Sequence, residues 1–283
     1  MLKPNQILFL KQTKKNIIGL IICVILFLSG FFIHGNTGLY INLSGFLIIF
    51  GGTLGATFLS YNMERIEILF KVLRTAYCTK TKSPNEIVRL LVDLSIKRRV
   101  KGVLSLQEDE NEITIAFLRQ AIGLLVDGYS KEQIKESLGA EMYFFRMRRD
   151  ETRRVLQTMA DVAPSFGLVG SVVGLIGMLA GAGDSEVVMA TVPIALTSTL
   201  YGIVFANFIF LPFASNIRER TVKELFLQKM ITDGILAIHD ELHPRMLERK
   251  LKSFLTPSAR HGRLVSFKNI KKKIDFNNLE SNV

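Results

Sequence analysis

The chain has 283 residues, of which 48% are hydrophobic, and it carries a formal net charge of +11. Its charged residues are missing from three long stretches, and this distribution excludes an ordinary soluble globular protein. Elsewhere the basic residues alternate with acidic ones, so the charge does not indicate nucleic-acid binding, which needs a continuous basic face.

The first stretch without Asp, Glu, Lys or Arg runs from residue 16 to residue 63. It is too long for a single membrane-spanning helix, which needs about 20 apolar residues. The sequence HGNTG at 34–38 interrupts it. We therefore predict a hairpin of two spans, at 17–33 and 39–60. Four lysines precede the hairpin, but no small-residue cleavage site follows its first apolar run, so we do not expect a cleaved signal peptide.

The segment from 61 to 160 is hydrophilic and its patterns are helical. SPNE at 83–86 is a capping box with proline at the first helical position, and Gly102 is a suitable end for the helix that it opens. A second capping box, SKEQ at 130–133, predicts a short helix that stops at Gly139. A longer helix should then continue into the next apolar stretch. We find no strand pattern of period two, so we predict an all-α protein.

Two further charge-free stretches, 162–183 and 187–217, predict a third span at 162–182 and a fourth at 190–214. The fourth span could start earlier than 190, because Pro193 lies near its beginning. The fold class is therefore an all-α polytopic membrane protein with four transmembrane helices and a large helical cytoplasmic loop.

Basic residues near span ends favour the cytoplasmic side of a membrane. They gather before the first span, between the second and third, and after the fourth, so both termini should be cytoplasmic. The expected organisation is a basic N-terminus (1–15), a transmembrane hairpin (16–60), a cytoplasmic helical domain (61–160), spans three and four (161–214), cytoplasmic helices (215–258) and a basic, flexible tail (259–283).

Five glycines in the third span recur at spacings of three and four, which places them on one face of a helix. Small residues on one face let another backbone approach closely. Two interpretations stay open: a helix–helix contact within one subunit, or a groove that faces another chain and lines a path beside Ser171. The five are Gly167, Gly170, Gly174, Gly177 and Gly181.

Other polar features lie in the same two spans. Pro164 removes a backbone hydrogen bond where the third span begins, so it kinks or hinges the helix. Thr197–Thr199 places three hydroxyls inside the fourth span, where each either bonds a carbonyl one turn back or joins Ser171 along a hydrated path. The spans hold no acid except Asp161 at an edge. If ions are conducted, another polypeptide must therefore supply the carboxylate.

Taken together, GGTLGATFLS, DVAPSFGLVGSVVGLIGML, STLYGIVFANFIFLPFA and GILAIHDELHPRMLERKLKSFLTP resemble the MotA/PomA family over residues 17–258. This family forms the A subunits of the flagellar stator within the MotA/TolQ/ExbB superfamily. The resemblance implies a pentamer around two MotB/PomB-like B subunits, each with an essential intramembrane Asp. It also implies a passage for H⁺ or Na⁺ between A and B helices in the bacterial inner membrane, whose lipids surround the complex, and torque on the rotor protein FliG. It implies no enzymatic activity, no cofactor, no metal and no nucleic acid.

The resemblance also assigns roles to single residues. Pro164 and Pro212 match the family's two functional prolines. The residues that match positions near the ion path are Asp161, Ser171, Ser198, Thr199 and Asn207. Ser171 and Ser198 stand where sodium-type members have Thr. This difference keeps a hydroxyl, which suits hard cations, but leaves the choice between H⁺ and Na⁺ open, with a slight preference for Na⁺.

The cytoplasmic loop carries opposite charge clusters at 97–101 and 108–112. Arg99 matches the family's rotor-facing Arg, while Gln107 stands at the position of its rotor-facing Glu. The rotor-interface candidates are Arg98, Arg99, Lys101, Gln107, Glu108 and Glu110. The alternative is a solvated face, or an internal ion pair between the clusters.

Three other hypotheses follow from the same sequence. HDELH at 239–243 has a zinc-like spacing, but Asp240 replaces the glutamate of the metalloprotease pattern and Pro244 follows at once, so we expect no metal site. A related energiser of the TolQ/ExbB type would have three spans in place of four. A membrane scaffold without ion flux would be indifferent to Pro164, Ser171 and Thr199.

Overall fold

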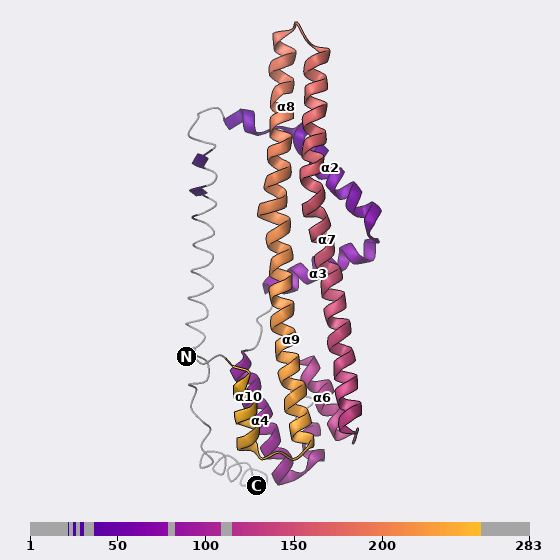
Figure 1. Cartoon of the computed structure of the whole chain (residues 1–283), viewed down its shortest axis with the longest axis vertical. Helices are drawn as coiled ribbons and strands as arrows, with labels where there is room; N and C mark the ends of the chain where they lie inside the picture. The colour runs from indigo at the N-terminus through magenta and orange to yellow at the C-terminus, as the bar shows by residue number, and fades with distance from the viewer. Residues whose placement is uncertain are drawn as a thin grey trace, which may run out of the picture. The chain divides into compact units, whose positions relative to one another are not determined.

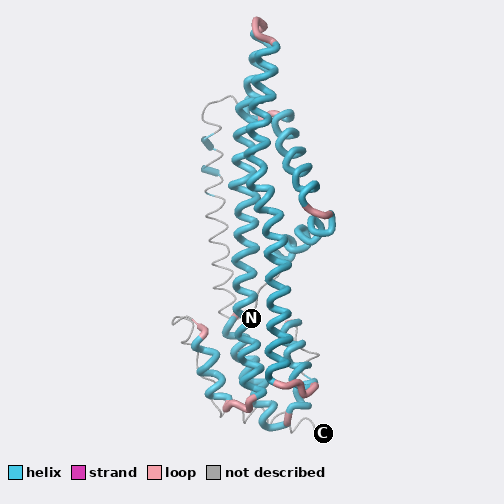
Figure 2. The backbone as a smooth tube through the Cα atoms, turned by 45° about the vertical axis from the view of Figure 1, so that its right-hand side comes forward, coloured by secondary structure: helices cyan, strands magenta, loops and turns pink. Residues whose placement is uncertain are grey.

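The computed structural model describes residues 22, 25, 26, 29, 30, 37–78, 83–108 and 115–255. All regular elements in those ranges are helices, and no strand occurs among them (Figure 2). The all-α prediction is confirmed. The first predicted span at 17–33 lies outside the described residues except at five isolated positions, and Glu110 and the tail at 259–283 lie outside them entirely.

Three helices of the described part are long and apolar enough to cross a membrane: Leu43–Ser60, Lys131–Ala180 and Ser185–His239. They contain the second, third and fourth predicted spans. The helix that corresponds to the second predicted span begins at Leu43, not at 39. The Asn42 side chain accepts the backbone N–H of Gly45 at 3.0 Å and so caps the start of this helix. The helix that contains the fourth span begins at Ser185, earlier than residue 190, and Pro193 lies inside it.

The chain divides into two compact units. Unit 1 contains residues 1–75 and 151–217, and unit 2 contains residues 76–150 and 218–283. Two long helices, α7 (Lys131–Ala180) and α9 (Leu211–His239), contribute residues to both units.

Unit 1 is built around the antiparallel pair of α7 and α8 (Ser185–Val204), which lie side by side (Figure 1). The rest of the unit is η1 (Thr37–Tyr40), α2 (Leu43–Ser60), the first part of α3 (Met63–Cys78), the π-helix η3 (Phe205–Phe210) and the first turns of α9. A separate apolar cluster of this unit joins Leu69 of α3, Val155 of α7 and Ile217 of α9.

The helix that contains the third span also corrects one prediction. The break expected at Gly139 is absent, because α7 continues through it as one helix of 50 residues. A glycine inside a helix costs about 1 kcal/mol relative to alanine. Ile134 and Leu138, just before it, are fully buried, and burial of one such side chain contributes roughly 1.5–3 kcal/mol. Tertiary packing therefore outweighs the local preference of Gly139.

Unit 2 is a helical domain with its own apolar core, to which Leu91, Leu118, Ile134 and Ile235 contribute from different helices. Its elements are α4 (Pro84–Lys101), η2 (Val103–Ser105), α6 (Ala116–Val126), α10 (Pro244–Ser253) and parts of α7 and α9. Both predicted capping boxes are formed, at 83–86 and at 130–133. Helix α4 ends where predicted, since Gly102 takes φ of 81°.

Candidate functional site

The glycine row of α7 is filled by α8 of the same chain. A methyl group at Gly174 would lie 2.6 Å from the backbone nitrogen of Ala195, and one at Gly170 would lie 2.5 Å from the Cβ of Ser198. The other three glycines face α8 in the same way: Gly167 meets Ser198 and Thr199, Gly177 meets Thr191, and Gly181 meets Val187. This geometry matches a contact within one subunit, and it leaves no room at these glycines for another chain.

Two hydroxyls meet directly across this contact. Ser171 Oγ lies 2.6 Å from the carbonyl oxygen of Ala195 and 2.5 Å from Thr199 Oγ1. A hydroxyl has a single proton to donate. Because Ser171 donates to the Ala195 carbonyl, the short contact requires Thr199 to donate to Ser171, and the Gly167 carbonyl, 3.4 Å from Thr199 Oγ1, is a second acceptor for the same proton. The structure thus brings together two of the five candidate ion-path residues.

Ser198, a third candidate, is enclosed between helices. Its side chain is fully buried and donates to the carbonyl of Ile194 at 2.7 Å. It lies between Gly170 of α7 and Gly45 of α2, where an added methyl would approach Ser198 Oγ to 2.5 Å and 2.8 Å, respectively. The sequence analysis missed Gly45, because a single small residue in an apolar span carries no periodic signal.

The remaining two candidates lie on exposed surfaces of unit 1. Asp161 on α7 accepts a hydrogen bond of 3.3 Å from Gln157, and Asn207 in η3 donates one of 2.9 Å to the carbonyl of Ile203. In the part of the chain that the structure describes, neither is hydrogen-bonded to the pair of Ser171 and Thr199.

Pro164 lies inside α7 beside a close backbone approach. A methyl group at Gly202 of α8 would lie 2.7 Å from the carbonyl oxygen of Ala163 and 3.2 Å from the Cα of Pro164. Gly202 is therefore what lets α8 pass the proline turn. The sequence signal that could have found it is its place on the α8 stripe of small residues, three or four positions after Ser198 and Thr199.

Pro212 follows a widened helical turn that was not predicted. The N–H of Leu211 bonds the carbonyl of Ala206, five residues back, as in a π-helix. Proline has no N–H and its ring clashes with the preceding turn, and a local π turn relieves both problems. The sequence signal was Pro212 itself, which predicts a distortion but not its form.

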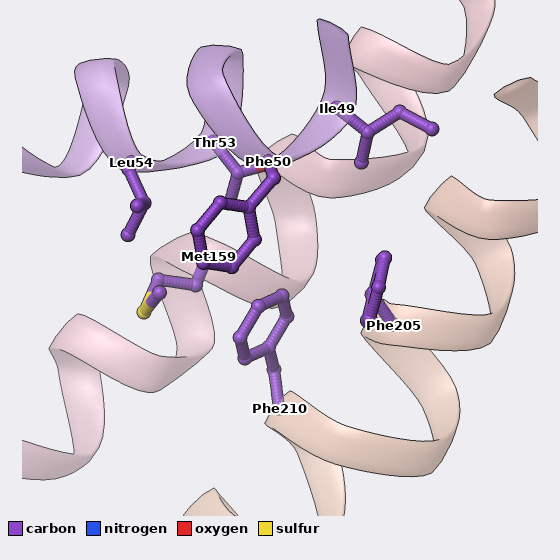
Figure 3. A pocket seen from close by; sticks show the side chains of 7 residues that line it. All are labelled: Ile49, Phe50, Thr53, Leu54, Met159, Phe205 and Phe210. Carbon is purple, nitrogen blue, oxygen red and sulfur yellow. The ribbon is translucent and has the colours of Figure 1, made fainter. Parts of the chain in front are cut away.

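The two ends of this π turn, Phe205 and Phe210, border a small apolar pocket between η3, α2 and α7 (Figure 3). Its other lining residues are Ile49, Phe50, Thr53, Leu54 and Met159. Thr53 is buried, and its hydroxyl has no hydrogen-bond partner among the described residues.

In unit 2, the charge clusters of the loop are partly paired with other groups. Lys97 Nζ lies 3.2 Å from Glu108 Oε2, so one ion pair joins the two clusters. Arg98, whose side chain is only 14% exposed, lies 3.4 Å from Glu241 in the turn after α9. Arg99 and Lys101 are exposed, as is Gln107. The predicted ion pair between the clusters therefore describes Lys97 alone, since Arg98 pairs outside both clusters, and Arg99 and Lys101 are exposed.

No group of three metal-ligating side chains occurs within the described ranges. His243 instead caps α10, because its Nδ1 accepts the backbone N–H of Arg245 at 3.3 Å. Asp240 beside it takes part in a hydrogen bond with Lys131, which lowers the pKa of its carboxyl.

Comparison with known proteins places the chain in a family. Residues 17–102 match the motility protein A N-terminal family, and residues 109–230 match the MotA/TolQ/ExbB proton channel family. The chain is 30% identical over 223 residues to motility protein A of Borreliella burgdorferi, with 79% of this chain and 86% of the relative covered. The chain belongs to the motility protein A family.

Two further relatives of this motility protein A homologue are similar to it over most of their length. It is 32% identical over 238 residues to the uncharacterized protein YtxD of Bacillus subtilis, covering 84% of this chain and 87% of that one. It is 29% identical over 226 residues to the chemotaxis protein PomA of Vibrio alginolyticus, covering 80% and 88%.

The fold of this family member matches a solved structure of MotAB from C. jejuni with a TM-score of 0.81 and 28% identity. The match covers 88% of this chain and 99% of the other. Together with the three apolar helices, the match identifies a polytopic inner-membrane protein of a stator and ion-channel family, which is not a family of enzymes.

Proposed function

We propose that this motility protein A homologue is the A subunit of a flagellar stator, which couples the flow of H⁺ or Na⁺ across the inner membrane to torque on the rotor. The observation that carries the proposal is the match to a chain of the C. jejuni MotAB complex over nearly its whole length. Both termini and the segment at 61–160 lie in the cytoplasm, in accordance with the distribution of basic residues.

Its partner within the membrane is a MotB/PomB-like B subunit. The stretches at 16–63, 162–183 and 187–217 contain no Asp, Glu, Lys or Arg, and their single histidine, His34, lies in the predicted turn between the first two spans. The B subunit therefore contributes an intramembrane Asp, and five copies of this chain surround two copies of it.

The ion path runs beside the hydrogen-bonded pair of Ser171 and Thr199, with Asp161 and Asn207 on exposed surfaces of the same unit. Hydroxyl and amide oxygens are ligands that hard cations accept. Ser198, which is fully buried between two glycines, positions α8 and does not itself contact the ion.

The rotor protein FliG binds the exposed part of the loop in unit 2. Arg99 and Lys101 supply positive charge there, and Gln107 and Glu108 supply the polar and acidic side. Glu110, which lies outside the described residues, is the remaining acidic candidate. Arg98 holds the end of α4 against the turn that carries Glu241, so its role is to position Arg99.

The test is swimming of cells that depend on this chain. Deletion of the chain should abolish its contribution to swimming, and re-expression should restore it. Swimming speed measured against sodium concentration, with and without a protonophore, identifies the ion: a speed that follows sodium and resists the protonophore indicates Na⁺, and the reverse indicates H⁺. Unchanged swimming after deletion would refute the stator role.

The proline in α7 separates a motor from a scaffold without ion flux. Pro164→Leu restores the backbone N–H that proline lacks and removes the hinge that we predict there, so it should abolish swimming while the complex with the B subunit still assembles. Co-purification of the B subunit checks assembly. Wild-type swimming of this variant would favour the scaffold.

A further inference from the structure

A rigid turn at the end of α4 holds one apolar side chain out of unit 2. The N–H of Gly102 bonds the carbonyl of Arg98 at 2.8 Å, and the hydroxyl of Ser105 bonds the carbonyl of Gly102 at 2.7 Å. On either side of Leu104, Val103 packs against the core and Leu106 is fully buried. Although Val103 and Leu106 are packed in or against the core, Leu104 between them is 74% exposed.

A second apolar residue lies in the last turn of α4, just before Gly102. Val100 is 58% exposed, and it stands between the exposed cations Arg99 and Lys101. A single exposed Leu or Val on a surface is ordinary. Here two of them flank one turn whose backbone is fixed from both sides, and fixed side chains lose little entropy when they bind.

The charge around this turn indicates the chemistry of its partner. Lys97 and Arg98 are paired with Glu108 and Glu241, so their charges are largely compensated. Among the described residues, Arg99 and Lys101 then leave the surface next to Val100 and Leu104 positive. A surface of this kind is complementary to an acidic surface that presents an apolar side chain or depression.

We propose that Val100 and Leu104 form the apolar centre of the rotor contact, framed by Arg99 and Lys101. The proposal rests on the proposed function and names the partner surface: an acidic face of the rotor protein with an apolar point at its middle. Charges at the rim of a contact steer the encounter, while a few desolvated side chains near its centre hold it. In this contact Arg99 and Lys101 steer the encounter, and Leu104, beside Val100, holds the bound rotor surface.

Substitutions at Leu104 test this proposal, because a purely electrostatic contact and a contact with an apolar centre predict opposite effects of Leu104→Lys on rotor binding. If the contact were purely electrostatic against an acidic surface, Leu104→Lys would strengthen it. With an apolar centre, Leu104→Lys and Leu104→Ser should both weaken rotor binding about tenfold, as expected for the loss of a central apolar side chain. Leu104→Met, which keeps volume and polarity, should stay near wild type. Stall torque of the motor at high load is the measurement.

A matched control lies elsewhere in the same unit. Met246 on α10 is also 58% exposed, and Met246→Ser should leave torque unchanged. Ion flux through the complex with the B subunit should be unchanged for all variants, which would show that the chain is folded and assembled. A Leu104→Lys variant with wild-type or higher torque, or a Leu104→Ser variant without loss, would overturn the proposal.

The two proposals fail in different ways. If deletion of the chain leaves swimming intact, the stator role is wrong. If the wild-type chain drives swimming and the Leu104 variants do so equally well, the stator role stands and the apolar centre is wrong. Photo-crosslinking from position 104 to FliG, compared with position 246, gives a readout independent of torque: a crosslink from 104 alone supports the contact, and equal or absent crosslinking from 104 opposes it.

Discussion

The space beside a glycine decides whether the chain tolerates a methyl group there. At Gly174 an added methyl would lie 2.6 Å from Ala195 N and 2.8 Å from its Cα, and backbone atoms cannot yield as a side-chain end does. Gly174→Ala should therefore destabilise unit 1 by about 1–3 kcal/mol, the usual cost of overpacking. Thermal unfolding of the purified complex in detergent measures the change.

The control is a glycine in open space. Gly55 in α2 has no atom within 4 Å of an added methyl, so Gly55→Ala should be neutral, or stabilising by up to about 1 kcal/mol through helix propensity. Equal melting temperatures of the two variants would show that the approach of α7 to α8 is looser than the structure has it.

A buried carboxyl in unit 2 gives a pH-dependent prediction. Burial raises the pKa of Glu141 above its ordinary value of 4.5, and Arg148 acts in the opposite sense with a smaller effect. Because the folded-state pKa is raised, the stabilising effect of the protonated form is complete below the ordinary value and is lost as pH rises through the folded value.

Glu141→Gln should therefore raise the melting temperature slightly at pH 7 and change it little near pH 4. The substitution removes a charge that burial disfavours, and at low pH the wild-type carboxyl is already neutral. Glu136→Gln, at an exposed position of the same helix, serves as the control. A larger gain at pH 4 than at pH 7 would contradict this assignment.

At the scale of a helix, the π turn depends on one residue. Pro212→Ala supplies the N–H that an α-helical turn needs, so η3 should contract to an α-helix. That contraction moves Asn207 and the pocket-lining Phe205 and Phe210 relative to α2. We expect swimming to fall about tenfold or more, since the loss of a functional helix distortion changes both the path and the packing.

A structure of the Pro212→Ala complex checks the cause directly. Pro193→Ala is the matched control, since Pro193 also lies inside a helix but ahead of the π turn. An unchanged i→i−5 bond from Leu211 to Ala206 in the variant would mean that the packing of Phe205 and Phe210, and not the proline, holds the turn open.

The elements differ in how well the sequence predicts them. Charge-free stretches mark where α2, α7 and α8 run, because the cost of burying a charge in a bilayer is large enough to shape composition. The capping boxes at 83 and 130 and the stop at Gly102 are local, so the sequence predicts them as well. The continuation of α7 through Gly139 depends on burial of neighbouring side chains, which are set by the tertiary fold.

The candidate site was predictable only in its parts. The spacing of the α7 glycines predicts a packing face, but the surface that fills it is α8, whose stripe contains Val187, Thr191, Ala195 and Ser198 and so mixes large and small residues. The hydrogen bond between Ser171 and Thr199 joins two helices, and only their three-dimensional register sets it. The same holds for Arg98, whose partner Glu241 is 143 residues away.

At the scale of the whole molecule, the two units differ in the side chains that they expose on their surfaces. Unit 2 has a closed apolar core and surface ion pairs, as soluble domains do. Unit 1 instead exposes large apolar side chains along α7, among them Leu168, Val172, Ile176 and Leu179. Surfaces of this kind are stable only against lipid or another apolar helix, and the face of α7 opposite α8 is thus available to both.

The predicted spans of the full chain contain no Asp, Glu, Lys, Arg or His, and this gives the last prediction. Reconstituted alone in liposomes, it should pass neither H⁺ nor Na⁺ above the background leak. Reconstituted with its B subunit, it should conduct, and conduction should vanish when the intramembrane Asp of that subunit is replaced by Asn. The Asp→Asn complex has the same composition and size, so it controls for leak through defects at the protein–lipid boundary. Selective flux through this chain by itself would require an ionisable group within its own spans, and the stretches 162–183 and 187–217 have none.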